Sequence, residues 1–267
     1  MASSSLLPRL LTAALGLPLL AALVWAGGAW FLAGVTLVAA WGLVEFQGLV
    51  PGGTWWPLRA VTLASGAALI SESALGLPGQ AATLAGAALL LLFLLLWHPE
   101  ERPLATWGSA VGGLAYIALP LGLLPPLREG SGGLMWVMLL LLGTFASDTG
   151  AYAVGRWLGR HPLAPRLSAG KTREGAAAGL LSSIIAVVGV CVVGGAPLAW
   201  PWVPVFGAAL SVAGQLGDLA ESMLKRSAGV KDAGRLLPGH GGLLDRLDSL
   251  LPAIVLTYAV RMVSVGP

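Results

Sequence analysis

The stretch FGAALSVAGQLGDLAESMLKR, residues 206–226, combines an apolar run with a set of charges near its end. Four polar residues have the spacing i, i+3, i+4 and i+7, which places them on one face of a helix: Asp218, Glu221, Ser222 and Lys225. Gln215 extends this polar stripe by one turn. Ionisable groups in spanning helices normally face a bundle interior or a cavity. The stretch therefore predicts a membrane helix with a functional face, and a salt bridge from Asp218 or Glu221 to Lys225 is the structural alternative.

The composition of the whole chain favours a membrane protein. Of its 267 residues, 57% are hydrophobic and 10% are charged, whereas about 25% are charged in an average soluble domain. The mean hydropathy is +0.84. We therefore predict an all-α, polytopic integral membrane protein with about nine transmembrane helices. The predicted spans are residues 8–26, 29–49, 57–73, 80–97, 105–123, 133–157, 175–195, 200–226 and 247–264.

Basic residues are distributed unequally between the two sides of this predicted bundle. Of the 15 Lys and Arg residues, only Arg128 and Arg261 fall on the side opposite the N-terminus. The positive-inside rule then predicts that the N-terminus and the two long loops, residues 158–174 and 227–246, are cytoplasmic. The first 25 residues could instead be a signal peptide, but the apolar character resumes at Ala29, which favours a first spanning helix.

Asp148 is a charged residue inside an otherwise apolar predicted helix. It is followed by Gly150, Gly155 and Gly159. Small residues allow a neighbouring helix to approach closely, and they would equally allow a ligand to approach the backbone. A binding site and a packed helix with one capped aspartate are the two interpretations.

The segment SAGKTREG, residues 168–175, precedes another predicted helix. Thr172 suits the cap of a helix that starts near Arg173, and Glu174 suits its first turn. A helix N-terminus beside a lysine is a natural phosphate site, which would involve Ser168, Lys171 and Thr172. An ordinary cap next to a basic loop is the alternative.

The last long loop combines glycines, one histidine and two aspartates. His240 lies among Gly239, Gly241 and Gly242, and Asp245 and Asp248 follow three residues apart. Carboxylate oxygens suit Mg²⁺, which usually shares its coordination shell with substrate phosphates. Four nearby cations could hold the remaining phosphate oxygens: Lys225, Arg226, Lys231 and Arg235. His240 could donate to an oxyanion or serve the fold. The residues alone indicate a Mg²⁺-dependent site for a phosphate-rich substrate.

The same loop resembles a known family signature in order and spacing. The matching positions are Ser222, Leu224, Lys225, Arg226, Lys231, Asp232, Gly234, Leu237, Pro238, His240, Gly241, Gly242, Leu243, Asp245, Arg246, Leu247 and Asp248. Two earlier blocks also match, namely residues 148–152 with 155–156, and residues 171–172 with 174–175. Together they resemble the phosphatidate cytidylyltransferases (CDP-diacylglycerol synthases) over roughly residues 140–250.

The resemblance implies a reaction of CTP with phosphatidic acid that gives CDP-diacylglycerol and pyrophosphate. It implies Mg²⁺, with K⁺ as a second ion, and the metal ligands Asp218 and Asp245. Catalytic roles are expected for Asp218, Asp245, Lys225, Asp248 and His240. Substrate binding is expected for Ser168, Lys171, Thr172, Ser222, Arg226, Lys231, Arg246 and Asp148. We further expect an integral protein of the bacterial inner membrane with its active site facing the cytoplasm, a homodimer among membrane lipids, and no nucleic-acid partner.

The predicted organisation divides the chain into two parts. Residues 1–104 would form a scaffold with dimer or lipid contacts, and residues 105–267 would form the catalytic region. A CTP-dependent polyprenol or dolichol kinase-like enzyme is the nearest rival function. A transporter with an internal ion site is a rival of another class, although its charges would lie near the midplane in paired halves. Glu45 and Glu72 are left without a role.

Overall fold

A computed structural model describes residues 6–50, 55–98, 101–234 and 241–265, and the regular secondary structure in them is helical apart from one short hairpin. Within them, six segments are long and apolar enough to cross a membrane: Gly28–Gln47, Pro103–Glu129, Gly133–Leu158, Arg173–Gly194, Trp202–Ser227 and Leu244–Ser264. Two further apolar helices, Ala14–Ala26 and Gln80–Leu95, are shorter. The helical class and the presence of several potential membrane spans are confirmed, whereas nine spans are not.

The helices form two compact units, which are described separately. The first comprises Met1–Glu129 and Ala228–Arg246, and the second comprises Gly130–Ser227 and Leu247–Pro267. The predicted division at residue 104 separates a scaffold from a catalytic region by function, whereas these units are defined by their internal packing. The predicted division therefore stays a prediction.

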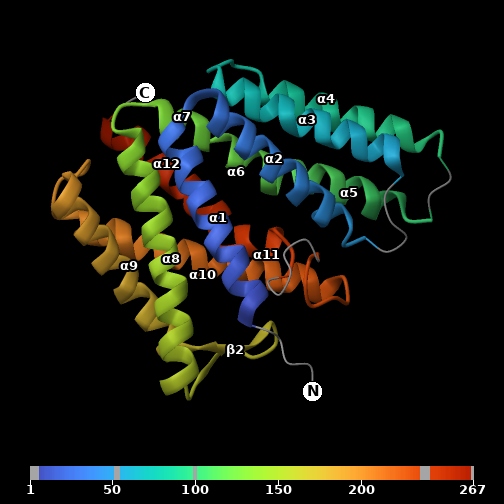
Figure 1. The fold of residues 1–267 in the computed structure, drawn as a ribbon. Helices are drawn as coiled ribbons and strands as arrows, with labels where there is room; N and C mark the ends of the chain where they lie inside the picture. Colours follow the sequence, from blue (N-terminus) through green and yellow to red (C-terminus); the bar gives the residue numbers. More distant parts are fainter. Residues whose placement is uncertain (1–5, 51–54, 99–100, 235–240, 266–267) are drawn as a thin grey trace. The chain divides into compact units, whose positions relative to one another are not determined.

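The first unit is built mainly from the N-terminal helices (Figure 1). Its elements are α1 (Leu6–Ala26), α2 (Gly28–Gln47), α3 (Trp56–Ala74), α4 (Gln80–Leu95), α5 (Pro103–Gly113), the π-helix η1 (Leu114–Ala118), α6 (Leu119–Gly122), α7 (Leu124–Glu129) and most of α11 (Leu244–Leu247). Helices α3 and α4 lie side by side. Between α2 and α3, the buried Gln47 Nε2 donates to Thr62 Oγ1 at 2.9 Å.

One predicted helix of this unit, residues 105–123, is interrupted. The π-helix η1 separates α5 from α6, and Pro120 is the second residue of α6. Proline has no N–H and its ring displaces the carbonyl four residues earlier, here that of Tyr116, and a widened turn accommodates this. The apolar segment from Pro103 to Glu129 nevertheless counts as one potential membrane span.

The connection between α1 and α2 is a sharp turn at two glycines. Gly27 and Gly28 have φ values of 64° and 50°, a region that glycine enters without steric cost. Arg128 Nε donates to the Val24 carbonyl at 2.6 Å, and the Gly28 N–H donates to Glu129 Oε1 at 2.7 Å. The last turn of α7 thus satisfies backbone groups that the turn leaves exposed.

The second unit contains α8 (Gly133–Leu158), β1 (Pro162–Ala164), β2 (Ser168–Thr172), α9 (Arg173–Gly194), α10 (Trp202–Ser227) and α12 (Leu250–Val265). Helices α8 and α9 pack closely because their contact consists of small residues. A Cβ on Gly150 would overlap the Ser182 side chain, and one on Gly179 would lie 2.9 Å from the Ser147 carbonyl oxygen. The close helix approach expected at Gly150 is therefore confirmed.

The long connection between α8 and α9 contains a hairpin that the sequence pattern does not predict. Strands β1 and β2 are antiparallel, with Pro162 opposite Thr172 and Ala164 opposite Ser168. The predicted start of the next helix is confirmed: α9 begins at Arg173, and Thr172 Oγ1 accepts the Gly175 N–H at 3.1 Å. Strand β2 therefore leads directly into the helix and fixes Lys171 beside its N-terminus.

Candidate active site

The polar stripe of α10 contains a buried ion pair. Glu221 is fully buried and forms a salt bridge with Lys225 one turn later, and the Lys225 side chain is itself mostly buried. The predicted alternative of an internal salt bridge is thus confirmed for Glu221 and Lys225. Asp218 has a different partner, so the stripe is not explained by this pair alone.

Asp218 pairs with the hairpin. Lys171 Nζ lies 2.6 Å from Asp218 Oδ2, and the two side chains are 21% and 38% exposed. Lys171 is the residue before the Thr172 cap, so the cap geometry and the ion pair fix the same short segment. Two residues predicted from separate motifs are therefore in contact.

Next to the hairpin, a second set of contacts holds the start of α9. Glu174 Oε2 accepts the N–H groups of Arg160 and His161 at 3.1 and 3.2 Å, and Glu174 Oε1 lies 2.5 Å from His161 Nδ1. The first-turn role expected for Glu174 is confirmed in position, but its contacts tie the hairpin to the helix. This gives Glu174 a structural role.

Asp248 lies in the turn before α12 and is buried. Its Oδ1 accepts the Ser249 N–H at 2.7 Å, and Ser249 Oγ donates to Asp148 Oδ2 on α8 at 3.0 Å. The carboxylates that act electrostatically on Asp248 are those of Asp218, Glu221 and Asp148. We call Asp148, Asp218, Glu221 and Asp248 the carboxylate cluster.

Glycine makes this convergence sterically feasible. A Cβ on Gly217 would overlap the carbonyl oxygen of Asp248 and crowd the Pro252 ring, and a Cβ on Gly214 would lie 3.4 Å from Ser249. The turn that carries Asp248 therefore packs directly against the backbone of α10 at these two glycines. The glycines place Asp248 within electrostatic reach of the polar stripe.

The carboxylate cluster is graded from exposed to buried. Asp148 is exposed, Asp218 is half-exposed, and Glu221 and Asp248 are buried. Gathering four acidic groups is unfavourable unless cations neutralise them, and Lys171 and Lys225 are the cations paired to the cluster. The two lysines therefore offset part of the negative charge of the cluster within the protein itself.

The donor chemistry of the cluster fits Mg²⁺. Carboxylate oxygens are its usual protein ligands, and Mg²⁺ typically takes one or two of them together with water and substrate phosphates. Within the part of the chain that the structure describes, no group of three or more acidic, histidine or cysteine side chains could by itself hold a metal ion. The exposed end of the cluster therefore suits a shared site better than a closed structural one.

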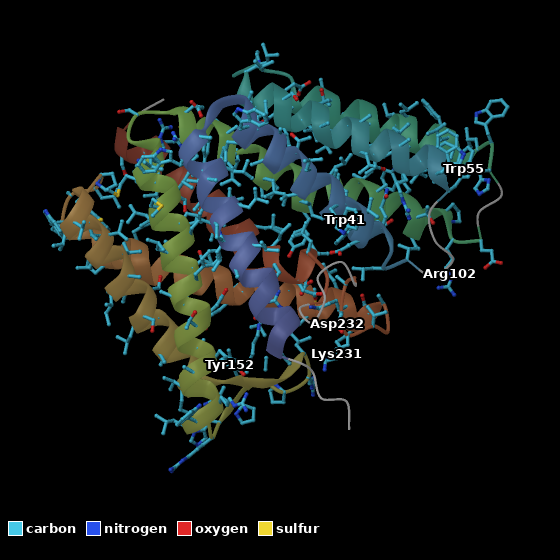
Figure 2. The ribbon with its side chains drawn as sticks, in the orientation of Figure 1. Trp41, Trp55, Arg102, Tyr152, Lys231 and Asp232 are labelled. Atoms are coloured by element: carbon cyan, nitrogen blue, oxygen red, sulfur yellow. The ribbon has the colours of Figure 1, made fainter. Side chains whose placement is uncertain are left out.

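Several predicted site residues lie in the first unit, on the segment that precedes and includes α11. Asp245 Oδ2 accepts the Gly242 N–H at 2.8 Å and the Ala233 N–H at 3.1 Å. Lys231 and Asp232 are exposed neighbours on this segment (Figure 2), and Arg246 is exposed on α11. His240, together with Arg235, lies outside the described residues. Asp245 thus has a role in holding its own loop, which spacing alone did not indicate.

The structure brings together part of the predicted set. Asp148, Lys171, Asp218, Lys225 and Asp248 belong to one connected arrangement in the second unit. Ser168 and Ser222 are half-buried and Arg226 is exposed. The joint use of Asp218 and Asp245 by one metal stays a prediction.

Two residues of this arrangement, Glu221 and Ser249, are not among the site residues predicted from the sequence. Glu221 belongs to the predicted polar stripe but not to the predicted site residues, although its position between Asp218 and Lys225 is a usable signal. Ser249 carries the link to Asp148, and no pattern in the sequence distinguished it.

Comparison with known proteins settles the family. The model of the cytidylyltransferase family matches residues 7–264, which is nearly the entire chain. The chain belongs to the cytidylyltransferase family. The resemblance drawn from the signature residues is therefore confirmed, and it extends to the N-terminal helices.

Proteins named phosphatidate cytidylyltransferase match this chain over about half of its length. The protein from Mycobacterium bovis is 43% identical over 136 residues, which are 50% of this chain and 42% of the relative. The protein from Brucella suis is 43% identical over 135 residues, 51% of this chain and 50% of the relative. The protein from Mycobacterium leprae is 43% identical over 137 residues, which are 50% of this chain and 41% of the relative. The match thus spans half or less of each relative.

Proposed function

We propose that this chain transfers the cytidylyl group of CTP to phosphatidic acid, giving CDP-diacylglycerol and pyrophosphate. The family membership and the printed names of its relatives support this reaction. The single observation that carries the proposal is the carboxylate cluster paired with Lys171 and Lys225 in otherwise apolar helices. Such a concentration of both charges suits two anionic substrates and the cations that neutralise them.

The proposed chemistry needs positioning and charge neutralisation rather than a covalent nucleophile. The phosphate oxygen of phosphatidic acid is already anionic, and it would attack the α-phosphate of CTP with pyrophosphate leaving. Lys171 and Lys225 would neutralise phosphate oxygens, with Lys231 and Arg246 as further predicted contributors. Arg226 and the Ser168, Thr172 and Ser222 hydroxyls are assigned to substrate binding.

Mg²⁺ is the proposed cofactor, with K⁺ as a second ion. Asp218 and Asp245 are the proposed ligands, and Asp148 and Asp248 would support them. When bound, Mg²⁺ would stabilise the negative charge that develops on the phosphates. The half-exposed Asp218 carboxylate and the carboxylates near it support a role in metal binding.

The proposed setting is the inner membrane of a bacterium, with the N-terminus and the site on the cytoplasmic side and the protein a homodimer. The excess of basic residues in the predicted cytoplasmic loops supports this orientation. Labelling of single cysteines placed at Arg160 and Gly132, in a Cys191→Ala background, tests it in intact cells. The orientation requires that a membrane-impermeant maleimide labels only the position at Gly132.

The decisive assay uses the detergent-purified chain with CTP, phosphatidic acid and Mg²⁺. We expect CDP-diacylglycerol and pyrophosphate, with no product when Mg²⁺ is chelated. Phosphorylation of a polyprenol by CTP would instead identify the kinase-like rival. Ion flux in proteoliposomes without nucleotide would identify the transporter.

Asp245 provides a matched pair of variants for this assay. Asp245→Asn keeps an oxygen that can accept the Gly242 and Ala233 N–H groups, so the loop should fold while turnover is lost. Asp245→Ala removes that acceptor and should lose both turnover and part of the folded yield. Full turnover in Asp245→Asn would remove Asp245 from the proposed metal ligands.

A further inference from the structure

Glu45 is a buried carboxylate in the last turn of α2, a helix that is otherwise almost entirely apolar. It is 7% exposed, and Trp41 lies one turn before it on the same helix (Figure 2). Burying a carboxylate is costly unless donors satisfy its oxygens. The contacts of Glu45 therefore indicate why the chain tolerates a charge here.

Both oxygens of Glu45 accept hydrogen bonds. Trp41 Nε1 donates to Oε1 at 3.2 Å, and the Leu244 N–H donates to Oε2 at 2.7 Å. Leu244 is the first residue of α11, and the first N–H groups of a helix have no partner within the helix. A carboxylate 199 positions earlier in the chain thus supplies the missing acceptor, through a charge-assisted bond.

Two glycines of the same loop lie directly against Glu45. A Cβ on Gly234 would overlap the carboxylate, and its three nearest neighbours would all be Glu45 atoms. A Cβ on Gly242 would lie 2.6 Å from Oε2 of Glu45 and 2.7 Å from the Gly234 nitrogen. Neither glycine has a positive φ, so space for Glu45 is the physical reason for glycine at both positions.

The residues that surround Glu45 also hold Asp245. The Gly242 N–H and the Ala233 N–H both donate to Asp245 Oδ2. Gly242 therefore touches Glu45 on one side and donates to Asp245 on the other. Leu244, which Glu45 binds, is the direct neighbour of Asp245. Any shift of Glu45 would move the backbone that orients the Asp245 carboxylate.

We propose that Glu45 is a positioning residue that anchors the loop through the Leu244 N–H and the two glycines, and so sets the place of Asp245 for the reaction. This inference rests on the proposed function, because Asp245 is assigned there as a metal ligand. It gives a role to a charge of the N-terminal helices.

The first test compares Glu45→Gln with Glu72→Gln in the detergent-purified chain. Glutamine keeps the size of Glu45 but replaces one acceptor oxygen with an NH₂ donor. This NH₂ group would face either the Trp41 Nε1–H or the Leu244 N–H, donor against donor. Glu72 is a matched control in the same unit, since it accepts a hydrogen bond at 2.5 Å from Thr83, which lies on α4 rather than on the loop. For Glu45→Gln we expect kcat to fall about 10- to 100-fold, as for other residues that orient metal ligands.

Two readouts separate positioning from a general loss of stability. The Mg²⁺ concentration for half-maximal rate should rise in Glu45→Gln, and amide hydrogen exchange should accelerate in residues 241–247 but not in α9. Glu72→Gln should leave both unchanged. Wild-type kinetics and exchange in Glu45→Gln would overturn the proposal, as would uniform acceleration of exchange along the chain.

A double-mutant cycle tests the same contact from the loop side. Gly234→Ala alone should reduce turnover, because its Cβ would displace the Glu45 carboxylate. In a Glu45→Ala background the space is free, so Gly234→Ala should cause no further loss. Additive losses would overturn the proposal. Should Glu45→Gln not fold, Gly234→Ala alone provides the kinetic and exchange tests.

The experiments distinguish failure of the proposed function from failure of the Glu45 anchor. A wild-type chain that makes no CDP-diacylglycerol would refute the reaction, while the exchange comparison would still report on the anchor. An active wild type with an unaffected Glu45→Gln variant would refute only the anchor.

Discussion

The ammonium group of Lys171 lies 2.6 Å from Oδ2 of Asp218, which joins the β1–β2 hairpin to the polar stripe of α10. Both side chains are partly exposed, so this pair contributes at most about 1 kcal/mol to stability. Its greater consequence is structural, because it holds the lysine of strand β2 against the aspartate of α10. The pair also gives Asp218 a cation partner within the protein itself.

Lys171→Met should therefore affect activity far more than stability. We expect turnover to fall roughly 100-fold, as when one charge-stabilising donor is removed, and the free energy of unfolding to change by less than about 1 kcal/mol. Initial rates and thermal unfolding in detergent measure the two effects. Arg166→Met is the control, since Arg166 is an exposed cation between the same strands. Equal rates for the two variants would exclude Lys171 from substrate binding.

The buried pair of Glu221 and Lys225 should behave in the opposite way. Lys225→Met removes the opposite charge of a fully buried carboxylate, which should reduce the free energy of unfolding by about 3–5 kcal/mol. Glu221→Met with Lys225→Met should recover most of this stability, because no buried charge is left at the pair. Thermal unfolding of the single and double variants measures the recovery.

Turnover of the same double variant separates the two roles of Lys225. It should stay inactive despite its recovered stability, because Lys225 is assigned to phosphate neutralisation. A stable and fully active double variant would show that the pair serves the fold alone.

Gly217→Ala should disturb both stability and the carboxylate cluster. The new Cβ would overlap the Asp248 carbonyl, which is backbone and cannot rotate away, so we expect a loss of about 1–3 kcal/mol from overpacking together with reduced turnover. Gly189→Ala on α9 is the matched control, since nothing lies within 4 Å of its Cβ. That variant should be up to about 1 kcal/mol more stable, because alanine favours a helix. Equal unfolding temperatures would contradict the close α10 contact.

Thr172→Ala tests the cap of α9. It removes the acceptor of the Gly175 N–H, which should cost about 1 kcal/mol. Thr172→Ser keeps the hydroxyl and should retain stability. Thermal unfolding gives the difference, and the rates show whether the hydroxyl also serves substrate binding. A stable but inactive Thr172→Ala would assign the hydroxyl to the substrate rather than to the cap.

Local patterns predicted the elements well and their interruptions poorly. The cap at Thr172 and the helix start at Arg173 were predictable because capping involves residues three apart. The π-helix before Pro120 and the β1–β2 hairpin were not, because each depends on how a short segment is accommodated by its surroundings. The expected count of nine spans rested on hydropathy windows, which do not measure the length of the helix that forms.

By itself, the sequence determined that apolar helices carry a polar stripe and which family signature follows it. Hydropathy and helical spacing are properties of neighbouring residues, so they need no knowledge of the fold. Only the tertiary structure decided the partners: Lys171 for Asp218, Lys225 for Glu221, and the Leu244 N–H for Glu45. A charge in an apolar helix must find a partner, but which one it finds depends on packing between segments distant along the chain.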